Sequence, residues 1–285
     1  MEIKHLYLAL ALLATTFSMP GCDGDDDDDA KPDTEVNGGD SSDKDGDSSS
    51  DKDGDSSSDK GSGSTDKDGG SNSDTYNTPD KSVGGTVPTI AEAVDLGLTS
   101  GTLWAPYNVG ATAPGEAGAY FAWGEVTADK SRYSWDYYKW TEDGGSTFTK
   151  YTTDGLTDLE NADDAAAVNW GGKWVMPNRD QLKELFDNCS IEWKAEGEHA
   201  EGSLAGYRLT SKTNGASLFL PAAGLHWLSQ HYDLGSYGYY WSAELCLGNS
   251  DYTHSLYFNS DNWHLDYNGR NCGQPVRPVI CSSAK

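Results

Sequence analysis

The sharp change in composition near residue 83 decides which part of this chain can form a folded core. Residues 23–82 contain almost nothing apolar, and an eight-residue unit of Asp, Lys, Gly and Ser at 43–50 is repeated at 51–58. Such a segment buries too little apolar surface to offset the entropy that it would lose on ordering, so we expect it to be disordered. All ten Trp residues follow it. The sequence therefore predicts one folded domain at residues 83–285.

The first 21 residues have the pattern of an export signal. A charged start is followed by an apolar run from Leu6 to Phe17, which is too short to span a bilayer but typical of a signal peptide. Gly21 and Cys22 then resemble the end of a bacterial lipobox, in which the cysteine receives lipid and becomes the mature N-terminus. We therefore expect a signal peptide at residues 1–21 and lipidation at Cys22.

Residues 22–82 would then be a lipidated cysteine followed by an acidic tether. The acidic run from Asp23 to Asp29 resembles the signal that sends Bacteroidetes lipoproteins to the cell surface, with a plain soluble spacer as the alternative. The repeated unit is similar to a calcium loop, but it lacks the glutamate at the twelfth position and flanking apolar helices, which favours a flexible stalk. We expect a protein of the outer membrane that faces outward and is held by its N-terminal lipid.

The charge of the chain argues against a nucleic-acid partner. The net charge is −26, and residues 23–82 contribute −14 of it through 20 acidic and 6 basic residues. The part from Val83 onward is also acidic, with 25 acidic and 13 basic residues. Because a nucleic-acid-binding face needs clustered Lys and Arg, we expect no nucleic acid among the partners.

Local patterns after residue 83 predict an α+β fold with two helices, short antiparallel strands and long irregular loops. The first helix is expected at 163–170. Asn178 should cap the second, which runs to about residue 188, with Gln181 completing a capping box. On this helix the apolar stripe of Leu182, Leu185 and Phe186 indicates a core face.

Alternating apolar residues predict the strands. Residues 214 and 215 are Asn-Gly, the dipeptide that favours a type I′ turn between two hairpin strands. The strands are expected at 94–98 and 102–105, at 207–212 and 216–220 around this turn, and at 238–245, 255–259 and 274–280.

The segment from Asn249 to Cys272 has an unusual composition. Of its 24 residues, 17 are Asn, Asp, Tyr, His, Ser or Cys, and none is Lys, Glu, Gln or Met. Codons for Asn, Asp, Tyr and His share a middle adenine, and those for Ser and Cys lie one base further away. A packed core would need more aliphatic residues. We therefore interpret the segment as a surface whose codons were scrambled from an Asn-rich template, and we expect the core elsewhere, on Trp104, Trp123, Trp170, Trp174, Leu182, Leu185, Phe219, Trp241 and Val276.

Six short motifs of the folded part together resemble one family. They are Ala93-Val94-Asp95-Leu96-Gly97-Leu98, Ala119-Tyr120-Phe121-Ala122-Trp123-Gly124-Glu125, Asp163-Asp164-Ala165-Ala166, Asn169-Trp170-Gly171-Gly172-Lys173-Trp174-Val175-Met176-Pro177, Leu220-Pro221-Ala222-Ala223-Gly224 and Val276-Arg277-Pro278-Val279. As a set they resemble the Fibrobacter succinogenes major paralogous domain of Bacteroidetes-type surface lipoproteins. That family is similar to the formylglycine-generating-enzyme branch of the C-type lectin fold. The resemblance implies a C-type lectin-like fold for residues 83–285.

The chain departs from the catalytic members of that branch. The formylglycine-generating enzyme works with a close pair of reactive cysteines, whereas Cys246, Cys272 and Cys281 are far apart in this sequence. The three-histidine iron site of related sulfoxide synthases is not recognisable among the six His residues either. We therefore expect no enzyme activity, and a degenerate enzyme of this kind is the less favoured reading.

The region from 226 to 273 also resembles the variable region of diversity-generating retroelement target proteins. Those proteins display a mutable ligand-binding face on a C-type lectin fold. In that family, template adenines are replaced by any base, so Asn codons become codons for Asp, Tyr, His, Ser and others, but not for Lys, Glu, Gln, Met or Trp. The resemblance implies that this region is diversified and that Trp241 and Trp263 belong to a fixed framework.

The predicted binding face combines aromatic and amide side chains. Tyrosine supplies a large contact area at low entropy cost, and asparagine supplies adaptable hydrogen bonds. The ligand would be a protein or glycan at the cell surface, and an invariant carbohydrate- or matrix-binding adhesin of the same fold is the alternative function. Ordinary polar loops are the alternative for the predicted ligand-binding residues, which are Tyr232, Asp233, Tyr237, Asn249, Asp251, Tyr252, His254, His264, Asp266, Tyr267, Asn268 and Asn271.

No catalytic, metal or cofactor site is expected. Asp163 and Asp164 are adjacent, so on a helix their side chains would diverge and could not act as a paired acid and base. The triplet of Ser229, His231 and Asp233 lacks a nucleophile-elbow pattern. The cysteines after residue 22 match no zinc spacing, and a lectin-type calcium motif is incomplete.

Some conspicuous residues are expected to be structural. Trp227, Tyr239, Tyr240 and Trp241 are predicted to be core aromatics instead of sugar-stacking platforms. Arg277 is predicted to be buried in a bidentate pair.

Overall fold

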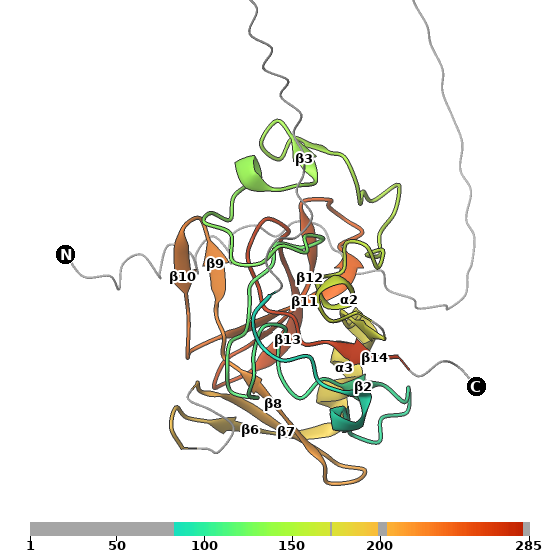
Figure 1. The fold of residues 1–285 in the computed structure, drawn as a ribbon, viewed down its shortest axis with the longest axis vertical. Helices are drawn as coiled ribbons and strands as arrows, with labels where there is room; N and C mark the ends of the chain where they lie inside the picture. Colours follow the sequence, from blue (N-terminus) through green and yellow to red (C-terminus); the bar gives the residue numbers. More distant parts are fainter. Residues whose placement is uncertain (1–82, 172, 199–203, 282–285) are drawn as a thin grey trace, which may run out of the picture. The chain divides into compact units, whose positions relative to one another are not determined.

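The computed structural model of the protein describes residues 83–171, 173–198 and 204–281 (Figure 1). The predicted signal peptide (1–21), the lipidation site Cys22 and the tether (22–82) lie outside these residues. No helix within the described ranges is both long enough and apolar enough to cross a membrane.

Within the described residues, both α-helices begin at caps that the sequence predicts. In α2 (Ala165–Trp170), Asp164 is the N-cap, and its carboxylate accepts hydrogen bonds from two backbone N–H groups of the first turn at 2.8 and 3.1 Å. In α3 (Arg179–Asp187), Asn178 and Gln181 form the predicted capping box through reciprocal hydrogen bonds of 2.8 and 2.9 Å. Both predicted helices are confirmed, although α2 begins two residues later than expected because Asp164 caps it from outside.

The strands are short and all their pairings are antiparallel. They form a four-stranded sheet β1-β2-β14-β5, the three-stranded sheets β6-β7-β8 and β11-β12-β13, and the two-stranded pairs β3-β4 and β9-β10. With the two helices and long loops, this is an α+β fold. The strands are β1 (Val94–Asp95), β2 (Leu103–Trp104), β3 (Thr141–Glu142), β4 (Thr147–Phe148), β5 (Trp174–Val175), β6 (Cys189–Lys194), β7 (Gly206–Ser211), β8 (Ser217–Pro221), β9 (Leu225–Trp227), β10 (Gln230–Tyr232), β11 (Gly238–Leu245), β12 (Tyr252–Phe258), β13 (Trp263–Gly269) and β14 (Val279–Ile280), and two 3-10 helices span Ile90–Glu92 and Trp135–Tyr137.

The predicted hairpin exists as β7 and β8, but its predicted type I′ turn is wrong. The Ser211 N–H donates to the Ala216 carbonyl (2.8 Å), and five residues, 212–216, connect the two strands instead of two. Gly215 has a positive φ of 76° and Asn214 does not, whereas a type I′ turn needs positive φ at both central residues. The Asn214 side chain instead donates to the Asp95 carbonyl (2.9 Å), which ties this turn to β1.

Other strands differ from expectation in length and number. The pair β1–β2 and strand β11 lie where predicted, while β12 begins three residues earlier. The strand expected at 274–280 is reduced to β14 because its first half pairs with loops: Gln274 and Phe121 exchange two backbone hydrogen bonds of 3.0 Å, and Val109 N–H donates to Val276 (3.0 Å). The sequence did not predict β3, β4, β5, β6, β9, β10 and β13.

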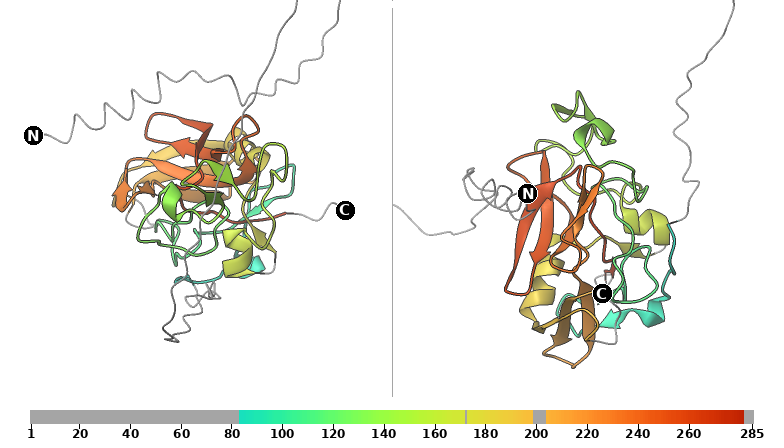
Figure 2. Two further views of the ribbon diagram at one scale, coloured as in Figure 1. Left: turned by 90° about the horizontal axis from the view of Figure 1, so that it is seen from above. Right: turned by 90° about the vertical axis from the view of Figure 1, so that its left-hand side faces the viewer.

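One hydrophobic core lies between α3 and the sheets β6-β7-β8 and β11-β12-β13, and Figure 2 shows α3 beside the latter sheet. The predicted stripe of α3 is buried here. Leu256 and Phe258 are fully buried in the same core, and the Phe258 ring stacks on Tyr207 at 4.7 Å. A Cβ atom at Gly238 would lie 2.1 Å from the Phe258 ring, so only glycine fits opposite it.

The expectation that residues 249–272 carry no core is therefore wrong. Alternation along β12 turns every second side chain inward even where the composition is polar. Arg270 is also fully buried: its guanidinium donates to the carbonyls of Tyr151 (2.7 Å) and Lys150 (3.0 Å) and lies 5.0 Å from the Trp123 ring centre.

A second hydrophobic core contains Trp123 and Trp241, each of which bonds a backbone carbonyl far away in the sequence. Trp241 Nε1 donates to the Phe121 carbonyl and Trp123 Nε1 to the Ser242 carbonyl, both at 2.8 Å. Of the nine residues predicted to carry the core, all but the half-buried Trp170 are buried.

Arg277 is buried as predicted, but among the described residues it forms no bidentate pair with a carboxylate. It donates to the Asn108 side-chain oxygen (2.8 Å) and to the backbone carbonyls of Ala105 (3.3 Å) and Pro106 (3.2 Å). Burial lowers the pKa of Arg277 to about 10.

Candidate ligand-binding face

Alternation along β11, β12 and β13 divides their side chains between two faces. The row of residues through Leu256 faces α3 and the first core. The neighbouring row of Tyr239, Tyr257 and His264 therefore points to the opposite side, which we call the outer face. Further along this face, Ser255 is buried and donates to the Gln274 side chain (2.8 Å). The outer face is thus open at the end where Tyr257 lies.

At this open end three half-buried tyrosines pack together, and we call Tyr237, Tyr239 and Tyr257 the tyrosine cluster. Their ring centres are 5.4 to 6.4 Å apart. The exposed ring of His264 continues the cluster at 4.5 Å from Tyr257, and the exposed Asp266 carboxylate lies 3.5 Å from His264 Nε2. Burial raises the pKa of Tyr257 to about 12, so its hydroxyl stays protonated at neutral pH.

Asp233 adds a half-buried carboxylate to the tyrosine cluster. It follows β10 in the left-handed region (φ 62°), and its backbone carbonyl accepts hydrogen bonds from Ser236 (2.9 Å) and Tyr237 (3.0 Å). Its Oδ2 accepts the Tyr239 hydroxyl at 3.0 Å. Burial raises the pKa of Asp233, while the Tyr239 hydrogen bond and the nearby His231 act in the opposite direction. Within the described ranges, this carboxylate takes part in no salt bridge.

A second group of predicted residues lies at the other end of β12 and on the other face. Tyr252 and Tyr267 are 36% and 43% exposed and meet edge to face at 5.3 Å. His254 pairs with Tyr267 across the strands and is half-buried near the start of α3, where burial and then Arg179 lower its pKa. Since Tyr252 and Tyr257 are five residues apart on one strand, about 17 Å separates the two groups.

The β9–β10 hairpin places one further predicted residue on the surface. Tyr232 is half-buried, and its hydroxyl donates to the Gln230 side chain (2.9 Å). The exposed Trp227 lies 6.2 Å from it, so the prediction that Trp227 is a core residue is wrong. Underneath, His226 and His231 stack at 4.4 Å and fix the hairpin against the body of the domain.

The remaining predicted residues shape turns or are buried. Asn249 accepts a hydrogen bond from the Asp251 N–H (2.9 Å), and the Asp251 carbonyl accepts one from the Arg270 N–H (3.1 Å). The side chain of Asn268 accepts the backbone N–H of the following residue (2.9 Å). Asn271 is only 5% exposed, so we leave it out of the candidate face.

Sequence reasoning missed two members of the tyrosine cluster. Tyr239 was assigned to the core, and Tyr257 was not singled out, whereas Tyr240 and Trp241 are buried as predicted. The signal was present in the pattern, because Tyr257 lies between Leu256 and Phe258 in a strand. Two apolar neighbours that both point inward force the residue between them outward.

The acidic residues considered for catalysis are occupied by structural contacts. Asp163 accepts the Tyr151 hydroxyl (2.7 Å) and pairs with Lys150 (2.5 Å), while Asp164 caps α2 and accepts the Met176 N–H (2.7 Å). The two side chains diverge, as expected of adjacent positions. His231 Nε2 lies 3.0 Å from a backbone carbonyl oxygen, and Asp233 is bonded to Tyr239, so no hydrogen-bonded triad with Ser229 forms in the described structure.

In the described parts of the chain, no group of three or more His, Cys, Asp or Glu side chains is arranged to hold a metal ion. Cys189, Cys272 and Cys281 are free thiols, and burial raises the pKa of Cys272 to about 12. Cys189 is also buried, whereas Cys281 is exposed.

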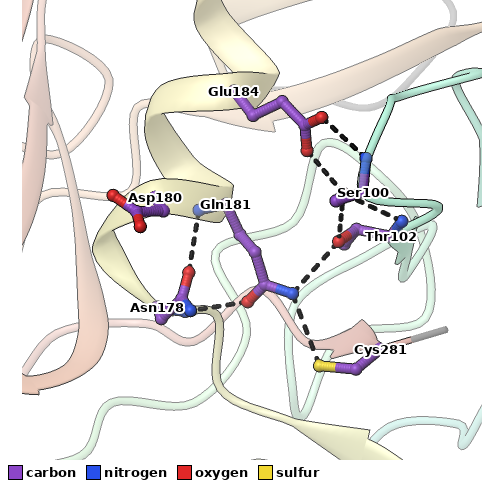
Figure 3. Close-up of a pocket in the computed structure, with 7 residues that line it drawn as sticks. All are labelled: Ser100, Thr102, Asn178, Asp180, Gln181, Glu184 and Cys281. Atoms are coloured by element: carbon purple, nitrogen blue, oxygen red, sulfur yellow. Dashed lines mark hydrogen bonds between the residues drawn. The ribbon is translucent and has the colours of Figure 1, made fainter. Parts of the chain in front are cut away.

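A pocket of about 370 Å³ lies at the start of α3 and is drawn in Figure 3. Glu184 accepts hydrogen bonds from the hydroxyl (2.5 Å) and the backbone N–H (2.9 Å) of Ser100. Gln181 donates to Thr102 Oγ1 (3.1 Å) and to Cys281 Sγ (3.4 Å). These hydrogen bonds join α3 to the turn between β1 and β2. Because the side chains that line the pocket mainly bond one another, we assign no ligand to it.

Compared with known proteins, the chain matches no family model, no curated protein and no solved structure. Its function therefore has to be inferred from the fold and the candidate face.

Proposed function

We propose that this chain is a cell-surface lipoprotein whose domain at residues 83–285 has a C-type lectin-like fold and binds a protein or glycan ligand without catalysing a reaction. In this proposal Cys22 carries the lipid that holds the protein in the outer membrane. The ligand-binding surface lies within residues 226–273 and is diversified by a retroelement.

One observation carries the proposal: exposed and buried residues alternate within a region of unusual composition. On β12 the exposed or half-buried positions are Tyr252, His254 and Tyr257, and on β13 the exposed positions are His264, Asp266 and Tyr267. Neighbouring positions such as Leu256 and Phe258 are buried. A sheet of this kind can change its exposed side chains while its buried side chains hold the fold.

The α+β architecture is compatible with the proposed C-type lectin-like fold. Two helices, short antiparallel strands and long loops agree with the expectation from the sequence motifs. The motif at 220–224 ends β8 and leads to the β9–β10 hairpin, and the motif at 276–279 contains Arg277, whose side chain bonds the loop at 105–108. These motifs therefore support a framework around the candidate face.

Sequencing the gene and its surroundings in many sibling isolates tests this proposal. We expect differences at exposed or half-buried positions such as Tyr267 and Tyr257, with Phe258 and Trp241 unchanged. We also expect a nearby reverse-transcriptase gene and an imperfect repeat of the region that differs from it at adenines. Differences spread evenly over buried and exposed positions would contradict diversification.

An invariant carbohydrate- or matrix-binding adhesin is the second candidate, and the exposed Trp227 favours it. Aromatic rings that are accessible on one side can stack on ligands, and Tyr232 and Gln230 lie beside this ring. The adhesin predicts that the same isolates carry an identical sequence at 226–273 and no repeat. The sequencing result therefore decides between the two functions.

A further inference from the structure

We propose that the tyrosine cluster and Asp233 bind the ammonium or guanidinium group of a lysine or arginine side chain on a protein partner. This inference rests on the proposed ligand-binding role of the region 226–273 and specifies the chemistry of its ligand. The expected ligand is therefore a cationic protein surface and not a neutral glycan.

The first support is the distribution of charge along the chain. From Thr213 to Gly269 the sequence contains no Lys or Arg, although it contains Asp233, Glu244, Asp251, Asp261 and Asp266. All strands that form the outer face and the adjoining hairpin lie in this range. Of these acidic residues, Asp233 contacts the tyrosine cluster and Asp266 contacts His264 beside it. Because the surrounding segment contains no Lys or Arg, a complementary partner would supply positive charge.

The second support is the state of the Asp233 carboxylate. Its Oδ2 accepts the Tyr239 hydroxyl at 3.0 Å, and Oδ1 has no hydrogen-bond partner among the described residues. A partly buried carboxylate that lacks a cation loses hydration without full compensation. The raised pKa of Asp233 reflects this burial. A cation that approaches Oδ1 would restore the missing interaction.

The third support is the aromatic surface around this carboxylate. Tyrosine ring faces attract ammonium and guanidinium groups through the ring quadrupole. Ring centres only 5.4 to 6.4 Å apart leave no space for a cation between the rings. The cation would therefore lie over the exposed ring faces beside Asp233. Arginine can stack on such a ring and bond the carboxylate at once, which favours arginine over lysine.

Ring resonances of tyrosine in the isotopically labelled full chain provide the test. The probes are N-acetyl-argininamide and N-acetyl-lysinamide, with N-acetyl-citrullinamide as a neutral probe of nearly the same shape as arginine. We expect the two cationic probes to shift the resonances of Tyr237, Tyr239 and Tyr257, with affinities at least about tenfold above that of the citrulline probe. Tyr240 is buried on the other face, so its resonance should stay unchanged and report an intact fold.

Two matched variants separate this site from general attraction to an acidic protein. Asp233→Asn keeps the size of the side chain and should lower the affinity for the arginine probe about tenfold. Asp154→Asn removes an exposed carboxylate from the loop that contacts Ser250, near the opposite end of β12, and should leave the affinity unchanged.

Three outcomes would overturn the inference: equal shifts with the citrulline probe, equal effects of the two variants, or no shift with any probe. If the gene nevertheless varies at the exposed positions as proposed above, the ligand-binding function stands and only its cationic ligand is rejected. If the gene does not vary either, diversification is rejected as well, and the invariant adhesin remains.

Discussion

The two faces of the β11-β12-β13 sheet use the same residue type in opposite ways. Tyr240 faces α3, is fully buried, and donates its hydroxyl to the Pro221 carbonyl at 2.8 Å. Its neighbour Tyr239 points outward, remains half-buried, and donates to the Asp233 carboxylate. One tyrosine therefore stabilises the fold, while the other contributes to a surface that a ligand can reach. Aromatic content alone does not distinguish these roles, but position in the strand does.

This difference suggests how one strand can serve both stability and variation. Along β12, Tyr257 and Phe258 are adjacent in sequence but lie on opposite faces. If the outer positions vary between copies of the gene, the inner positions must hold the sheet in place regardless of what their neighbours become. The following predictions test this separation.

The largest effect is expected for Phe258→Ala. The ring is fully buried and stacks on Tyr207 at 4.7 Å and on Tyr240 at 6.1 Å, so its loss leaves a cavity between two sheets. We expect a loss of about 3–5 kcal/mol in the free energy of unfolding, or roughly 6–20 °C in Tm for a domain of this size. Thermal melts followed by near-ultraviolet circular dichroism measure it.

The matched control is Tyr257→Ala on the same strand. Its ring is half-buried on the outer face, so we expect a clearly smaller loss than for Phe258→Ala. Phe258→Leu should also lose less than Phe258→Ala, because it retains most of the apolar volume. Equal melting temperatures for Phe258→Ala and Tyr257→Ala would show that the two faces are not energetically distinct.

The helices and their caps could be predicted from the sequence, because capping is local. Asn178 and Gln181 are three residues apart, and their reciprocal hydrogen bonds need no partner from elsewhere in the chain. The apolar stripe of α3 likewise follows from helical spacing. The polar character of residues 249–272 was also recognised, and eight of the nine predicted binding residues in that segment are exposed or half-buried.

The non-local contacts could not be predicted in this way. The residues near Arg270 in the sequence do not predict that its guanidinium is buried. Its partners, the Trp123 ring and the carbonyl of Lys150, lie more than a hundred residues away in the sequence. Strand β13 was missed because its alternation, with Leu265 half-buried between exposed His264 and Asp266, was hidden by its polar composition. Composition correctly suggested a surface, but only the strand register reveals that the predicted face is divided between two sides.

A five-fold variant with an intermediate effect tests the candidate face as a whole. Replacing Asn249, Asp251, Tyr252, His264 and Tyr267 together by Ala should cost at most about 2.5 kcal/mol, taking about 0.5 kcal/mol for each surface substitution, whether exposed or half-buried. The Tyr252–Tyr267 contact makes that sum inexact, since contacting residues are not additive. The thermal melt should remain cooperative and lie above that of Phe258→Ala. A variant that unfolds at or below Phe258→Ala would show that these residues are structural.

The smallest effect on stability is expected for Asp233→Asn. Burial raises the pKa of Asp233 in the folded state above its unfolded value of about 3.9, so the folded protein binds this proton more readily than the unfolded chain does. The contribution of Asp233 to stability is therefore present at low pH and is lost as pH rises through the folded-state pKa. Asn does not titrate, can still accept the Tyr239 hydroxyl, and tolerates the left-handed backbone at this position (φ 62°).

At pH 7 the Tm of Asp233→Asn should accordingly equal or slightly exceed that of the unsubstituted protein, and the difference should disappear near pH 3. Thermal melts at both pH values decide this. A Tm several degrees lower at pH 7 would mean that the fold already supplies a favourable partner for the carboxylate, and the argument that it awaits a cation from a ligand would then lose its energetic basis. If Asp233→Asn leaves the Tm unchanged but lowers the affinity for the arginine probe, Asp233 serves ligand binding and not the stability of the fold.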